Sequence, residues 1–227
     1  MNWFERNIAT RWFDYGWAYR LRITMLRRRH GADEYRDGDR LPVLLLPGVY
    51  ETWHFLETVG AHLHDLGHPV HVVPGFGRNL LPIADMAELA RQYVREQDLT
   101  HLALVGHSKG GLIGKTMMMS EEGDRIDRMI AINTPFGGSD YARFVPISTL
   151  REFVPTHDAI VSLAENAAVN ARIVSIFSEW DPIIPNGSLL EGAVNIQLPV
   201  GGHFRILDRD DLLDVVARAI GDEPPAT

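Results

Sequence analysis

A serine flanked by glycines, in the run Gly-His-Ser-Lys-Gly at positions 106–110, is the feature of this sequence best suited to chemistry. The apolar run Leu102–Val105 precedes it and a helical pattern follows it. A serine in such a strand–turn–helix context has a strained backbone with positive φ, which lifts its hydroxyl above the sheet. The glycines leave room for this turn, because Cβ atoms two residues away on either side would collide. The dipole of the helix also favours negative charge there. We therefore interpret Ser108 as a candidate nucleophile.

The elements that must position this serine alternate along residues 41–220. Short apolar runs without alternation, separated by helical patterns, are typical of an α/β protein whose parallel sheet is buried on both faces. Strands are predicted at Val43–Leu46, Val70–Val73, Leu102–Val105, Met129–Ile132, Ile173–Phe177 and Val194–Leu198. Helices are predicted at Trp53–Leu66, Ile83–Gln97, Gly110–Ser120, Ala159–Ala168 and Asp210–Ile220.

On the serine motif and its context, residues 41–220 resemble the α/β-hydrolase family, and within it the small bacterial lipases and esterases. The resemblance implies a minimal α/β-hydrolase fold, with a mostly parallel sheet of about six strands, flanking helices and a short cap.

The family order along the chain is nucleophile, acid, histidine. Asp181 and His203 each follow one of the last two predicted strands, so the resemblance implies a triad with Ser108. In it His203 would take the serine proton, and Asp181 would orient the imidazole. Glu179 and Asp158 remain alternatives for the acid.

The resemblance also implies an oxyanion hole built from the backbone N–H groups of Val49 and Lys109. Pro47 stands where many relatives have histidine, and Lys109 where many have an apolar residue or glutamine. Two roles are open for the Lys109 side chain. It could pair with an acid or solvent while the backbone acts, or it could bind an anionic part of the substrate.

Residues 134–170 lie where the family carries a segment that covers the site. Their apolar side chains indicate a small hydrophobic cap over an accessible pocket for an acyl chain, although the same side chains could simply anchor the segment to the core. Arg78 follows a predicted strand end and could lie at the rim of the pocket, although a solvated loop residue is the expected interpretation. The candidate substrate-binding residues are Tyr50, Trp53, Phe76, Phe136, Tyr141 and Phe144.

The function implied by the resemblance is a serine hydrolase that cleaves carboxylic esters of small acyl compounds or lipids through an acyl-enzyme on Ser108. A thioesterase, an acyltransferase or an amidase would use the same triad. A non-catalytic binding protein on the same scaffold is a further alternative, which the complete triad disfavours. We expect no cofactor and no metal site. His62 and His64 are two apart on a predicted helix and point in different directions.

Charge is unevenly distributed along the chain. The formal net charge is −8, with +5 in residues 1–30 and −13 in the rest, and the acidic body disfavours nucleic acid as a partner. Cysteine is absent, which fits a reducing compartment. No signal-peptide core or membrane-spanning run is present, so we expect a soluble, cytoplasmic protein with peripheral membrane contact left open.

Residues 1–40 are expected to form a basic, aromatic helix followed by a linker, and residues 221–227 a flexible tail. The helix could pack on the hydrolase body, contact a second copy in a homodimer, or lie on anionic lipid. Its apolar stripe recurs at spacings of three and four, at Ile8, Trp12, Tyr15, Tyr19, Ile23 and Leu26.

Overall fold

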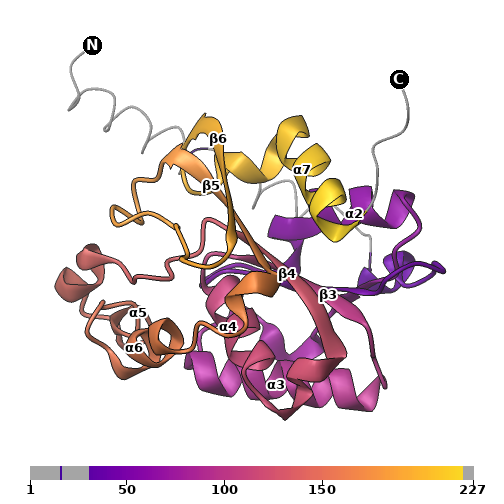
Figure 1. The fold of residues 1–227 in the computed structure, drawn as a ribbon, viewed down its shortest axis with the longest axis horizontal. Helices are drawn as coiled ribbons and strands as arrows, with labels where there is room; N and C mark the ends of the chain where they lie inside the picture. The colour runs from indigo at the N-terminus through magenta and orange to yellow at the C-terminus, as the bar shows by residue number, and fades with distance from the viewer. Residues whose placement is uncertain (1–15, 17–30, 222–227) are drawn as a thin grey trace.

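A parallel β-sheet with the strand order β2-β1-β3-β4-β5-β6 forms the centre of the structure (Figure 1). The computed structural model describes Gly16 and residues 31–221, and within this part all five strand pairings are parallel. The predicted α/β class and six-stranded parallel sheet are therefore confirmed. The strands are β1 Val43–Leu46, β2 Val70–Val72, β3 Leu102–His107, β4 Ile126–Ile132, β5 Ile173–Trp180 and β6 Val194–Gly201.

Helices cover both faces of the sheet, with α2 and α7 on one side and α3 and α4 on the other (Figure 1). All residues of β1 and β3 are buried, which explains why these strands show no polar alternation. Each buried Leu, Ile or Val side chain contributes about 1.5–3 kcal/mol through removal from water. The helices are α2 Glu57–Asp65, α3 Ile83–Glu96, α4 Lys109–Met118, α5 Ser148–Arg151, α6 Asp158–Glu165 and α7 Asp210–Ile220.

Several strands run further toward their carboxyl ends than the apolar pattern predicted. The pairing of β3 with β4 continues to His107, and the pairing of β5 with β6 continues to Trp180 and Gly201. Backbone pairing does not stop at the first polar side chain, whereas an apolar run does. The predicted helix Trp53–Leu66 also divides into a 3₁₀ turn, Trp53–Leu56, and α2.

The segment 134–170 connects β4 to β5 and contains α5, α6 and a 3₁₀ turn at Asp140–Phe144. Several hydrogen bonds join it to loops at the carboxyl edge of the sheet, two of them donated by side-chain hydroxyls. Ser139 Oγ donates to the carbonyl of Ile183 at 2.8 Å, and Thr149 Oγ1 donates to that of Leu80 at 2.7 Å. The segment is therefore joined to the same edge from which a parallel sheet presents its binding loops.

The predicted basic helix in residues 1–30 and most of the tail 221–227 lie outside the described residues. The part of the linker that is described, residues 31–40, contains a 3₁₀ turn at Ala32–Tyr35. None of the described helices combines the length and the apolar character needed to cross a membrane.

Candidate active site

Ser108 stands at the sharp turn between β3 and α4, with φ 51° and ψ −119°. Its backbone N–H donates to the carbonyl of Ile132 at 2.9 Å, which continues the β3–β4 pairing up to the turn. A Cβ atom on Gly106 would lie 2.6 Å from the nitrogen of Gly111, and one on Gly110 only 1.8 Å from the carbonyl oxygen of Leu46. Glycine is therefore required on both sides of the serine, as the sequence pattern indicated.

His203 and Asp181 form a buried, hydrogen-bonded pair. Nδ1 of His203 lies 2.6 Å from Oδ2 of Asp181, and Oδ1 of the carboxylate accepts from the N–H groups of Ile183 and Ile184 at 2.8 and 3.1 Å. Burial alone would raise the pKa of this carboxyl. The charge and hydrogen bond of His203 and the two N–H groups outweigh burial, so the pKa lies below its ordinary value. The carboxylate is thus charged at neutral pH, and Nδ1 carries the hydrogen between the two groups.

The alternative acids lie elsewhere. Glu179 is exposed on β5, and Asp158 is exposed at the first residue of α6. Asp181 is therefore the carboxylate that the structure pairs with His203.

Ser108 and His203 both line one cavity of about 900 Å³ at the carboxyl edge of the sheet. Its wall is mostly apolar, and segment 134–170 supplies much of it. The residues contributed by that segment are Pro135, Ser139, Tyr141, Ala142, Val145, Leu150 and Phe153.

Of the six predicted substrate-binding residues, Tyr50 and Tyr141 line this cavity. The other four are not among the residues that line it. Phe76 and Phe136 are buried in the core cluster on the α3–α4 face. Trp53 stacks on His54 with ring centroids 4.2 Å apart, and Phe144 is 83% exposed outside the cavity.

The loop that carries Val49 is fixed by hydrogen bonds from its surroundings. The carbonyl of Pro47 accepts from Asn79 Nδ2 at 2.7 Å, and the N–H of Tyr50 donates to the carbonyl of Arg78 at 2.8 Å. Val49 lines the cavity beside Ser108. The structure therefore holds this backbone segment against the site.

Lys109 is the first residue of α4, and the N–H of a first-turn residue has no carbonyl partner within its own helix. Its side chain is buried and turned to the loop after η3 (Pro74–Phe76), where Nζ donates to the carbonyls of Asn79, at 3.2 Å, and Leu81. Burial lowers the pKa of this ammonium to about 8, although Glu152 and Asp85 act in the opposite direction. The ammonium stabilises the loop and is not among the groups that line the cavity.

Comparison with known proteins identifies the fold through solved structures, and it finds no match among family models or curated proteins. An extracellular α/β-hydrolase from a Paenibacillus species matches the structure with a TM-score of 0.58 at 18% identity, over 81% of this chain and all of that one. A hydrolase from Oleispira antarctica gives 0.61 at 16% identity, over 86% and 98% of the two chains. A structure from work on carboxylesterases of Nitrososphaera gargenis gives 0.58 at 15% identity, over 83% and 91%. The chain has the α/β-hydrolase fold.

Some residues that line the cavity of this α/β-hydrolase fold were not predicted from the sequence. Pro182, Ile183 and Ile184 follow Asp181 directly, and Phe204 follows His203; all four line the cavity. Their position after the carboxyl ends of β5 and β6 is a signal that could have found them.

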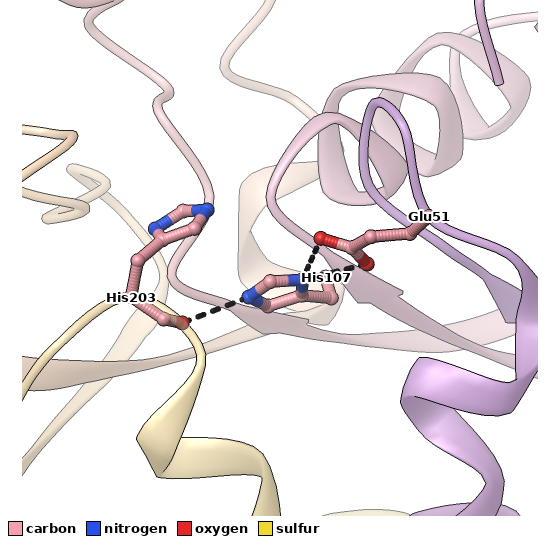
Figure 2. A group of neighbouring side chains, drawn as sticks. All are labelled: Glu51, His107 and His203. Atoms are coloured by element: carbon pink, nitrogen blue, oxygen red, sulfur yellow. Dashed lines mark hydrogen bonds and ion pairs between the residues drawn. The ribbon is translucent and has the colours of Figure 1, made fainter. Parts of the chain in front are cut away.

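Glu51, which contacts His107, was also missed (Figure 2). Glu51 is 2% exposed and lines the cavity, and its carboxylate oxygens lie 2.8 and 3.0 Å from Nδ1 of His107. Among the described residues, one group of three His, Asp or Glu side chains has its ligand atoms within 4.8 Å of one another: Glu51, His107 and His203.

Proposed function

We propose that the protein is a serine hydrolase that cleaves carboxylic esters through an acyl-enzyme on Ser108. The observation that carries this proposal is a strained serine lining the same cavity as a histidine whose Nδ1 is held by a buried carboxylate. A serine hydroxyl is a weak nucleophile unless a neighbouring base takes its proton, and this arrangement supplies the base.

In the first half-reaction Nε2 of His203 removes the proton of Ser108 while Oγ attacks the ester carbonyl carbon. The carbonyl oxygen becomes an oxyanion, for which the N–H groups of Val49 and Lys109 are the proposed donors. When the tetrahedral intermediate collapses, the bond to the leaving alkoxide breaks, and the imidazolium returns its proton to that oxygen. Asp181 stabilises the imidazolium throughout.

In the second half-reaction water takes the place of the alcohol. His203 removes a proton from the water, the hydroxide oxygen attacks the acyl carbon, and the serine oxygen leaves with the proton from the imidazolium. The products are the carboxylic acid and free Ser108, so the enzyme is regenerated.

The cavity wall supports an apolar acyl group as the part of the substrate that is bound. Val145, Leu150, Phe153 and Ile184 all line it, and burial of an acyl chain gains about 0.8 kcal/mol for each CH₂ removed from water. We propose esters of short to medium acyl chains, for which a cavity of about 900 Å³ has room.

The test is labelling with a fluorophosphonate probe, followed by hydrolysis of p-nitrophenyl esters of increasing chain length. The native chain should be labelled, Ser108→Ala should not, and Ser120→Ala, at a serine outside the cavity, should be labelled like the native chain. Hydrolysis by Ser108→Ala at the native rate would contradict the proposal. Thioesters and amides in the same panel distinguish the other acyl-transfer reactions that the same residues could perform.

A further inference from the structure

The buried pair Glu51–His107 is not used in the mechanism above. His107 occupies the position before Ser108 and is completely buried, and the side chain of Glu51 is 3% exposed. Figure 2 shows the imidazole between the Glu51 carboxylate and the main-chain carbonyl of His203, with Nε2 3.0 Å from that carbonyl oxygen.

The partners of the imidazole fix where its hydrogens are. A carbonyl oxygen can only accept, so Nε2 of His107 carries a hydrogen. Nδ1 faces a carboxylate that also accepts from the N–H of Gly48 at 2.7 Å. A neutral imidazole with its hydrogen on Nε2 would direct a lone pair at an anion, so the pair must hold one further proton. That proton lies between Nδ1 and the carboxylate, so both ring nitrogens of His107 take part in hydrogen bonds.

The same contacts argue against a metal ion between Glu51, His107 and His203. A metal ligand needs an unprotonated ring nitrogen, and both nitrogens of His107 are engaged with acceptors. The cluster is therefore a hydrogen-bonded unit.

This unit joins the three segments that meet at the site. Glu51 binds the backbone of the Val49 loop through the N–H of Gly48, and His107 is bonded covalently to Ser108. The carbonyl of His203 receives a second hydrogen bond, at 3.0 Å, from Nδ2 of Asn133, so both of its lone pairs are occupied. The main chain of His203 is thereby held from two directions.

We propose that Glu51 and His107 are positioning residues that hold the oxyanion-hole loop, the nucleophile and the base in one fixed arrangement. The inference rests on the proposed function. Its effect is through hydrogen bonds and not through net charge, because Glu51 and His107 with their shared hydrogen are neutral together. A displacement of about 1 Å between reacting groups can cost about 10²-fold in rate, which is the scale of effect expected here.

A matched pair of variants isolates the hydrogen bond to His203. In Glu51→Gln, the amide oxygen accepts from Gly48 and the amide nitrogen donates to Nδ1 of a neutral His107, so every contact can form again. In the double variant Glu51→Gln/His107→Phe, the donor to His203 is lost, and neither variant leaves a buried charge unpaired. We expect kcat within about fivefold of native for the first and about 10²-fold lower for the second, with KM changed by less than about twofold.

The control is His68→Phe, which removes a buried histidine that binds the carbonyl of Leu41 at 2.7 Å and does not line the cavity. It should lower Tm without lowering kcat. A folded double variant that keeps the kcat of Glu51→Gln would overturn the proposal, as would a loss of rate that appears equally in His68→Phe.

A measurement on the native chain does not depend on any variant folding. Nitrogen-15 NMR of the histidine rings should find hydrogen on Nε2 of His107, and an unprotonated Nε2 would refute the inference. Fluorophosphonate labelling of Ser108 separates the two proposals. If the native chain is labelled and the variants are as fast as native, the positioning role fails while the proposed hydrolase stands.

Discussion

Replacing Asp181 by asparagine should move the hydrogen of the neutral His203 imidazole from Nδ1 to Nε2. The carboxylate oxygen Oδ1 accepts two backbone N–H groups, so the amide oxygen of the variant must take that place. The opposite orientation would set an NH₂ group against two N–H donors and would lose two hydrogen bonds worth about 0.5–1.5 kcal/mol each. The NH₂ group therefore faces Nδ1 of His203 and donates to it.

With Nδ1 accepting, the hydrogen of the neutral ring moves to Nε2, the nitrogen that must take the proton of Ser108. The base is then blocked while its position is kept. A change of this kind lowers kcat by about 10⁴-fold, or about 5.5 kcal/mol at 1.36 kcal/mol for each factor of ten.

The assay is kcat on a p-nitrophenyl ester together with the second-order rate of fluorophosphonate labelling. Both rates should fall in Asp181→Asn, while Glu179→Gln, at the exposed carboxylate two residues earlier, should behave as native. The reasoning is refuted if folded Asp181→Asn stays within tenfold of the native rate.

Because the folded-state pKa of Asp181 is lowered, its carboxylate also stabilises the fold above about pH 4, and this contribution is lost as the pH falls through the lowered value.

Three further changes test the packing around the site. Gly110→Ala would place a Cβ 1.8 Å from a carbonyl oxygen of β1, so it should destabilise by about 3 kcal/mol or more in urea unfolding, whereas Gly137→Ala, with nothing within 4 Å, should not. Lys115→Met should raise Tm at pH 7, because burial lowers the pKa of this lysine to about 8 and so disfavours its charged form in the fold. The gain in Tm should shrink as the pH rises from 8 to 10.5, where the lysine of the native chain loses its charge. A gain in Tm that stays constant over this range would count against burial as the cause. Leu150→Trp should fill the cavity and reduce kcat/KM for long acyl esters more than for acetate esters. The control is Leu189→Trp, at a residue that is 68% exposed, and an equal effect there would show that the cavity wall is not responsible.

The parts of the structure that could be predicted from the sequence are those with a local signature. The glycines around Ser108 are demanded by close backbone contacts at the sharp turn, and the strands are marked by runs that must be apolar because both faces are covered. The order of Asp181 and His203 after two strands also placed them at the same edge of a parallel sheet, where the structure pairs them.

The parts that could not be predicted depend on the direction of single side chains or on distant partners. Phe76 and Phe136 follow strand ends as pocket residues do, yet they are buried without lining the cavity, and no nearby residue signals the difference. Glu51 and His107 are 56 residues apart and meet only because β1 and β3 are neighbours. A buried pair of this kind has no pattern along the chain.

The position of β5 and β6 at one flank of the sheet has a consequence for how the protein loses activity. Ser108, the proposed nucleophile, directly follows β3, which is paired on both sides, whereas the loop bearing His203 follows β6, which has a neighbour on one side only among the described strands. Local opening of β5 and β6 would separate His203 from Ser108 while the remaining four strands stay assembled. Mild denaturant should therefore inactivate the protein before it abolishes the far-ultraviolet signal of its helices, and removal of the denaturant should restore turnover without complete refolding.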